Sequence, residues 1–208
     1  VMIAGSLSTV EIVDKQEGYL GWLPNWYVFT PWGFAGFVLF MISAVAEANR
    51  SPFDIPEGES EIVAGYFLEY SGFKFALFFL AEYLGMFAAS GLAITLFLGG
   101  WHAPLPFLDW MPSWAWFFTK LMAIIFSLIW VRGTLPRLRV DQLMGFAWKF
   151  MLPLALLNVA VAGLWRFLPR GLERWLLCAA LLVVPYVLLA RGLSANRQLT
   201  KRTYRFAE

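Results

Sequence analysis

Six carboxylates and one arginine crowd into a single stretch of this otherwise apolar chain. The stretch runs from residue 46 to residue 72 and reads AEANRSPFDIPEGESEIVAGYFLEYSG. Its charged side chains are Glu47, Arg50, Asp54, Glu57, Glu59, Glu61 and Glu69. Cytoplasmic loops of membrane proteins usually carry an excess of Lys and Arg. An acidic loop of this kind therefore predicts a specific role for its carboxylates.

Three further charges lie inside apolar runs, and for one of them, Lys120, snorkelling to the interface and a buried role fit the sequence equally well. Glu82 is nine residues beyond Phe73, which is roughly 14 Å along a helix and near the centre of a bilayer. An acid there costs about 2.5 to 3.5 kcal/mol on insertion scales, and such residues typically mark ion or proton pathways. The alternative is a carboxyl held neutral by a neighbouring helix.

Lys149 is the third such charge. Pro153, four residues later, removes the backbone donor that would bond the Lys149 carbonyl. Together with Asp141 near the helix start, this kink predicts a polar path, although a kink used only for packing fits the sequence equally well.

The composition indicates which elements position these charges. Hydrophobic residues make up 60% of the chain and charged residues 14%, which is typical of a membrane protein. Long apolar runs favour helices over a barrel, so we expect an all-α membrane helix bundle. A single cysteine, Cys178, excludes an internal disulfide and a four-thiolate cluster and is interpreted as a packing residue. The lone His102 makes no metal site, and the net charge of +2 does not suggest nucleic acid.

We expect one membrane domain over residues 1–208. Runs of about twenty apolar residues predict five spans, which are Thr30–Ala46, Phe73–Leu98, Trp114–Val131, Gln142–Trp165 and Leu172–Ala190. Residues 1–10 are interpreted as the end of a preceding helix, and Glu11–Asn25 as a polar loop. Within the acidic segment, residues 47–72, apolar residues at helical spacing predict a short amphipathic helix at the cytoplasmic surface.

The basic residues predict the orientation. If the acidic segment is cytoplasmic, so are the 132–139 loop and the basic tail, residues 191–208. That side then holds nine Lys and Arg residues against four on the other, as the positive-inside rule expects.

Three motifs together resemble one family. They are the acidic segment itself, ALFFLAEY at residues 76–83, and LPRLRVDQLM followed by WKFMLPL at residues 135–154. Their order and spacing are similar to the quinone-proximal membrane subunit, the H type, of proton-pumping NADH:quinone oxidoreductase (respiratory complex I). The resemblance covers essentially the whole chain and corresponds to the C-terminal part of the family.

The resemblance implies roles for the charged residues. A quinone chamber would be lined or supported by Arg50, Asp54, Glu57, Glu59, Glu61 and Glu69. Glu47 and Glu82 would begin a proton pathway of buried carboxylates, with Asp141 and Lys149 as further candidates. The peripheral arm would dock against Arg132, Arg137 and Arg139. Because quinone reduction takes up two electrons and two protons, a reduced quinone near clustered carboxylates would shift their proton affinity.

The resemblance also implies partners and location. Quinone is the expected substrate, and no cofactor is expected in this chain; FMN and iron–sulfur clusters would belong to partner subunits. The partners would be peripheral-arm subunits with the terminal cluster, small and antiporter-like membrane subunits, and lipid. The expected location is the bacterial cytoplasmic membrane, with the C-terminus cytoplasmic.

Two other interpretations stay open on the sequence. One is a related membrane subunit of a hydrogenase or another quinone-reactive complex. The other is a stand-alone secondary ion transporter, which predicts inverted repeats, and no internal repeat is evident in this sequence.

Overall fold

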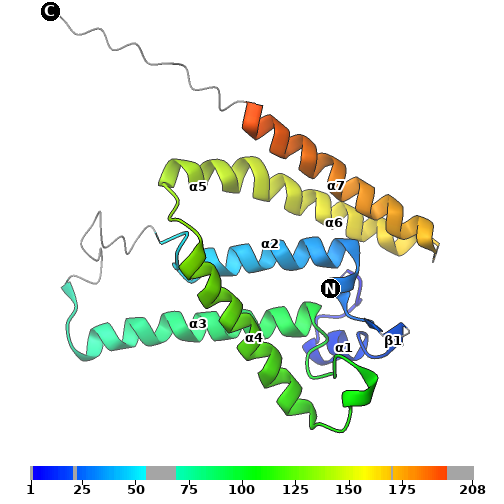
Figure 1. Cartoon of the computed structure of the whole chain (residues 1–208), viewed down its shortest axis with the longest axis horizontal. Coiled ribbons are helices and arrows are strands. Elements are labelled where there is room, and N and C mark those ends of the chain that lie inside the picture. The colour runs from blue at the N-terminus through cyan, green and yellow to red at the C-terminus, as the bar shows by residue number, and fades with distance from the viewer. Residues whose placement is uncertain (1, 21–22, 55–68, 170, 196–208) are drawn as a thin grey trace, which may run out of the picture.

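The computed structural model describes residues 2–20, 23–54, 69–169 and 171–195, and it is almost entirely helical (Figure 1). The elements in chain order are α1 (Thr9–Asp14), β1 (Tyr19–Leu20), β2 (Leu23–Pro24), η1 (Tyr27–Phe29), α2 (Pro31–Glu47), α3 (Phe73–Phe97), η3 (Pro106–Leu108), α4 (Ser113–Thr134), α5 (Val140–Phe146), η4 (Ala147–Met151), α6 (Leu152–Phe167) and α7 (Leu172–Ala195). The predicted membrane helix bundle is therefore confirmed as a fold class.

Three stretches of the described chain are long and apolar enough to cross a membrane. They are α3, α4 and the continuous helix Val140–Phe167, while α2 is apolar but only 17 residues long. The fifth predicted span lies within α7. The membrane character is thus supported, and the count of five spans stays a prediction.

The N-terminal region differs from the sequence-based expectation. Residues 2–8 form turns and a bend rather than the end of a helix. The predicted polar loop 11–25 holds most of α1 and a two-residue antiparallel pairing of β1 with β2. The turn-forming residues of this stretch predict a loop. The short helix α1 forms because it packs against α3, and the local sequence does not show this contact. The predicted surface helix falls mostly on residues 55–68, outside the described part of the chain.

Helix α2 is the central element of the bundle. It contacts α3 on one side and α6 and α7 on the other. Its start is well defined, since the Thr30 hydroxyl accepts the Gly33 amide at 3.2 Å and Pro31 occupies the first turn. A Cβ at Gly33 would lie 1.9 Å from the Tyr27 carbonyl oxygen, so only glycine fits there.

Two apolar cores flank α2. One joins α2, α6 and α7 through Trp32, Val161, Trp165, Cys178 and Leu182. The other joins α3 and α4 through Ala93, Ile94, Leu121, Ile124 and Ile125. Cys178 is fully buried in the first core, which confirms its interpretation as a packing residue.

The predicted irregularity near Pro153 is present. Residues Ala147–Met151 form a π-helical turn that ends two residues before Pro153, and Lys149 lies inside this turn. A π turn lets the chain absorb the missing proline donor without breaking the helix.

Candidate functional site

The segment that leaves the C-terminal end of α2 is held from two sides. Asn49 has a positive φ of 47°, which turns the chain sharply, and the Phe53 amide then donates to the Arg50 carbonyl at 2.9 Å. Asn tolerates this left-handed conformation better than most residues. The turn presents the Arg50 side chain toward α3.

On the α3 side, Arg50 pairs with Glu82. Its Nη2 lies 3.6 Å from Glu82 Oε2, and the two side chains are only 12% and 11% exposed. The guanidinium also lies over the rings of Phe79 and Tyr83, at 5.4 and 4.7 Å from their centroids. Cation–π contacts of this kind favour a desolvated arginine.

This contact fixes the level of Glu82 in the bundle. Arg50 comes three residues after α2 ends, and α3 extends past the C-terminal end of α2 (Figure 1). Glu82 therefore lies level with the end of α2, and its depth in a bilayer stays a prediction.

On the other side, the same segment is tied to the loop between α4 and α5. The Leu138 amide donates to the Pro52 carbonyl at 3.0 Å, and the Arg137 guanidinium donates to the Asp54 carbonyl. We call Arg50, Pro52, Asp54, Glu82, Arg137 and Leu138 the Arg50 junction. It brings together at least one residue from each of the three roles predicted from the sequence.

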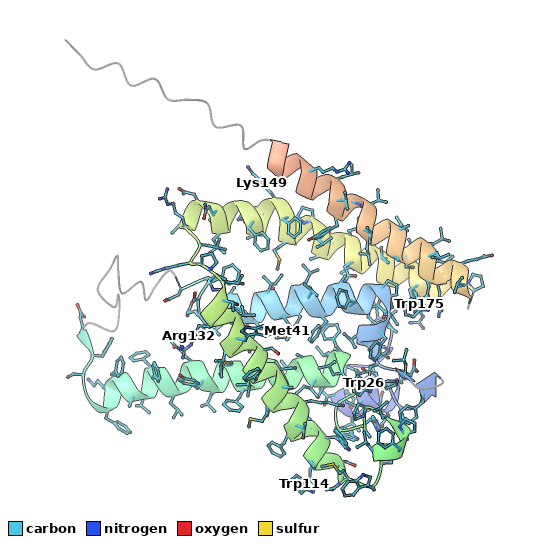
Figure 2. All side chains as sticks on the ribbon, in the orientation of Figure 1. Trp26, Met41, Trp114, Arg132, Lys149 and Trp175 are labelled. Atoms are coloured by element: carbon cyan, nitrogen blue, oxygen red, sulfur yellow. The ribbon has the colours of Figure 1, made fainter. Side chains whose placement is uncertain are left out.

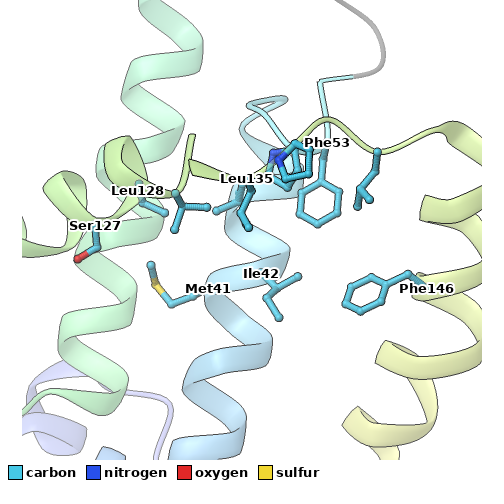
Figure 3. Close-up of a pocket in the computed structure, with 12 residues that line it drawn as sticks. Met41, Ile42, Phe53, Ser127, Leu128, Leu135 and Phe146 are labelled. Carbon is cyan, nitrogen blue, oxygen red and sulfur yellow. The ribbon is translucent and has the colours of Figure 1, made fainter. Parts of the chain in front are cut away.

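Two cavities flank the Arg50 junction. The larger, about 540 Å³, is lined by apolar side chains and one serine from α2, α4, α5 and residues 52–53. Figure 3 shows Met41, Ile42, Leu128 and Phe146 around this space. The smaller, about 390 Å³, lies between α2, α3 and α4 and is lined by Arg50, Tyr83 and Arg132 as well as apolar residues. Both volumes fall in the range of small-molecule pockets.

The other predicted site residues are not part of the Arg50 junction, although Arg132 lines the smaller cavity with Arg50. Six of them have exposed side chains, and these are Glu47, Glu69, Arg132, Arg139, Asp141 and Lys149. Figure 2 shows Arg132 on α4 and Lys149 on the helix that continues into α6. The burial expected for Glu47 is therefore not found, because α2 ends there. Glu57, Glu59 and Glu61 lie outside the described residues.

A second polar cluster lies at the opposite end of α2, where Trp26 is labelled in Figure 2. Gln16 is 1% exposed, and its amide joins three elements. Its Nε2 donates to the carbonyls of Ile12 at 3.2 Å and Thr95 at 3.0 Å. Its Oε1 accepts the amides of Tyr27 at 3.3 Å and Gly99 at 3.1 Å.

Lys120 completes this cluster from α4. Its ammonium donates to the carbonyls of Leu98, Gly100 and His102 at 2.7, 2.9 and 2.7 Å. It also lies 4.1 Å from the centroid of a Trp26 ring. The cation thus neutralises the carbonyl end of α3, where a helix dipole favours positive charge. We call Gln16, Trp26 and Lys120 with their partners the Gln16–Lys120 cluster.

Sequence reasoning missed this cluster. A glutamine in a polar loop is expected to be solvated, and snorkelling to the interface is one of the two interpretations of Lys120 that the sequence leaves open. The signal that could have found it is the pair Gly99–Gly100, both at positive φ. A Cβ at Gly99 would lie 2.2 Å from Trp26 Nε1, so the backbone must approach that ring closely.

Two tyrosines near this cluster have altered acidity. Burial raises the pKa of Tyr27. Burial, and then the Asp109 carboxylate to which its hydroxyl donates at 3.3 Å, raise the pKa of Tyr19. Both effects disfavour the phenolate.

Comparison with known proteins identifies the family of this chain. Residues 1–163 match the family model described as NADH dehydrogenase. The H subunit of the NADH-quinone oxidoreductase of Geobacillus kaustophilus is 51% identical over 170 residues, covering 80% of this chain and 48% of that protein. The chain belongs to this NADH dehydrogenase family. H subunits of the same name also occur in Geobacter metallireducens, 51% identical over 78% of this chain and 46% of the relative, and in Burkholderia vietnamiensis, 47% identical over 83% and 49%.

Family membership confirms the resemblance found in the sequence motifs. H-subunit relatives at about 50% identity, together with three long apolar helices, support a membrane subunit of NADH-quinone oxidoreductase. The chain spans about half the length of the curated relatives that it matches. Among the described residues, no three His, Cys, Asp or Glu side chains gather in a possible metal site.

Proposed function

We propose that this chain forms part of the quinone-binding chamber of respiratory complex I and couples quinone reduction to proton translocation. Quinone is the substrate, while FMN and the iron–sulfur clusters belong to partner subunits. In this proposal Arg50 and Asp54, with Glu57, Glu59, Glu61 and Glu69, line or support the chamber. Glu47 and Glu82 begin the proton pathway, and Asp141 and Lys149 continue it on the α5–α6 helix.

The Arg50 junction is the observation that carries this proposal. A single five-residue segment, 50–54, connects a buried acid on α3 to the loop that carries Arg137. Buried ion pairs are a poor source of stability, since desolvation offsets most of their attraction. An acid–base pair kept there at that cost suits a functional role. The flanking cavities support access by an apolar molecule of quinone size.

The remaining proposed roles follow the same geometry. The α4–α5 loop contains Arg137 and Arg139, and Arg132 lies in the last turn of α4 before it. We assign these three arginines to docking of the peripheral arm that holds the terminal cluster. Small and antiporter-like membrane subunits and lipid complete the surroundings. The location is the bacterial cytoplasmic membrane with the C-terminus cytoplasmic.

The alternative functions receive less support. The relatives carry the name of an NADH-quinone oxidoreductase, which favours membership in that complex over membership in a hydrogenase complex. A stand-alone transporter would leave the link between segment 50–54 and the α4–α5 loop without a purpose.

Proton pumping by variants of the intact complex tests the proposal. We expect Glu82→Gln to lower the number of protons moved per electron to less than about half, because an amide in its place cannot exchange a proton. Glu47→Gln is expected to act in the same direction, while Lys74→Gln, an exposed charge in the first turn of α3, serves as the control. A normal ratio in both Glu variants would remove these residues from the pathway.

A photo-reactive quinone tests the chamber separately. We expect it to label the segment from Asp54 to Glu69 in the intact complex. Removal of the peripheral arm should abolish the labelling, and labelling confined to other subunits would contradict the assignment.

A further inference from the structure

The Arg50 junction has a mechanical arrangement that neither the family nor the sequence motifs assign. Segment 50–54 makes no regular secondary structure, yet it is fastened at both ends. At its start, the Arg50 side chain is held by Glu82, Phe79 and Tyr83. Two and four residues later, the carbonyls of Pro52 and Asp54 are held by Leu138 and Arg137.

The two fastenings differ in kind. The bonds to Leu138 and Arg137 use backbone carbonyls, whose acceptor strength does not change. The contact with Glu82 uses a carboxylate, whose attraction for Arg50 exists only while the acid is ionised. The 3.6 Å separation is longer than a direct hydrogen bond, so attraction between charges rather than a directional bond holds the pair.

Space around Arg50 allows its side chain to move. The guanidinium lines the cavity of about 390 Å³ between α2, α3 and α4, and Arg132 lines the same cavity. Within the described part of the chain, Glu82 is the carboxylate that pairs with Arg50. Loss of the Glu82 charge therefore changes the balance of forces on the whole segment.

We propose that Arg50 is a positioning residue that transmits the charge state of Glu82 to the α4–α5 loop. While Glu82 is ionised, Arg50 stays on α3 and segment 50–54 is stretched between α3 and Leu138. When Glu82 is neutral, Arg50 is released, and the hold of Pro52 and Asp54 on Leu138 and Arg137 loosens. This inference deepens the proposed function, since it rests on the assignment of Glu82 to the proton pathway.

The path of the signal continues into α5. The Arg139 amide donates to Gln142 Oε1 at 3.3 Å at the start of that helix, one residue after Leu138. Loosening at Leu138 therefore reaches the N-terminus of α5, where Asp141 lies. A change in the charge of Glu82 would thus reach both Arg137, one of the proposed docking arginines, and Asp141, a proposed pathway residue, through segment 50–54.

Amide hydrogen exchange in the intact complex tests this link without requiring quinone turnover. We expect the Leu138 amide to exchange about tenfold faster in Glu82→Gln than in the parent complex, because local opening becomes easier when its anchor is lost. Arg50→Gln should give a similar increase. Arg50→Lys keeps the charge but not the fork, and its increase should stay below about threefold.

The exchange experiment has a matched control variant and a second variant that can decide the outcome alone. Lys74→Gln removes an exposed charge from the same helix as Glu82 and should leave Leu138 exchange unchanged. If Arg50→Gln does not assemble, Glu82→Gln alone decides, because Gln differs little from Glu in volume.

The outcomes separate this inference from the proposed function. Unchanged Leu138 exchange in both Glu82→Gln and Arg50→Gln would overturn the link even if pumping falls. Faster Leu138 exchange with a normal pumping ratio would support the link and overturn the role of Glu82 in proton transfer.

Discussion

The two ends of α2 hold buried polar groups in opposite ways. At the N-terminal end, Gln16 and Lys120 form seven hydrogen bonds, all to backbone groups, at 2.7 to 3.3 Å. At the C-terminal end, Arg50 meets a titratable side chain at 3.6 Å beside two cavities. The hydrogen-bond partners in the first arrangement are backbone groups, which do not titrate, whereas the second arrangement depends on a carboxylate that can take up a proton.

This difference suggests that one end of α2 is rigid and the other end can respond to a change in charge. A cation surrounded by fixed carbonyls is stable in one position only, so the Gln16–Lys120 cluster joins α1, α3 and α4 rigidly. A cation that faces a carboxylate can be released by a single proton. Because the Gln16–Lys120 cluster is rigid, a change in the Arg50–Glu82 contact acts on the α4–α5 loop and does not spread through the whole bundle.

The largest expected effect comes from breaking the rigid end. Lys120→Met leaves three carbonyls without their charged donor, and each such bond contributes about 1.5 to 3 kcal/mol. We expect local opening around Gly99 and Gly100 to become about 3 kcal/mol easier, which is roughly a hundredfold faster amide exchange. Exchange measured on the intact complex checks this. Lys74→Met is the control, and a change below about tenfold would show that the carbonyls find other partners.

A smaller effect is expected when the charged end is made neutral. Arg50→Gln or Glu82→Gln alone breaks the ion pair while one of its two charges stays buried, and we expect helix opening over residues 83–90 to become easier by about 1 to 3 kcal/mol. The double variant should recover most of this loss, because neither charge of the pair remains. Exchange along α3 measures the recovery, and strictly additive losses would argue against a direct pair.

The smallest effect concerns alkaline pH. Because burial raises the pKa of Tyr27 above its ordinary 10.0, its stabilising contribution is complete below about pH 10 and is lost as pH rises through the raised pKa. Tyr27→Phe should therefore remove part of the decline in thermal midpoint between about pH 10 and pH 11. An identical decline in parent and variant would mean that another group causes it.

The sequence predicts the helices better than the contacts between their ends. Apolar runs locate α2, α3 and α4 within a few residues, and Pro153 predicts the irregular turn before it. These features depend on local chemistry, on hydropathy and on a missing donor. The family motifs likewise single out the charged residues of the Arg50 junction one by one.

The pairing of those residues was not predictable from the sequence. Arg50 and Glu82 are 32 positions apart, and Leu138 is 86 positions beyond Pro52. Their contacts depend on how far α3 projects past α2, which no local pattern encodes. Gln16 was missed for a related reason, since its four partners come from three separate stretches of chain.

The π-helical turn at residues 147–151 carries a consequence for recognition by neighbouring molecules. A turn of this kind accommodates one extra residue, and one residue rotates everything beyond it by about 100° around the helix axis. Phe146, before the turn, faces the cavity beside α4, whereas Leu154 and Val161, after it, are buried with the rest of the bundle. The continuous helix Val140–Phe167 thereby presents different faces to its neighbours before and after the turn.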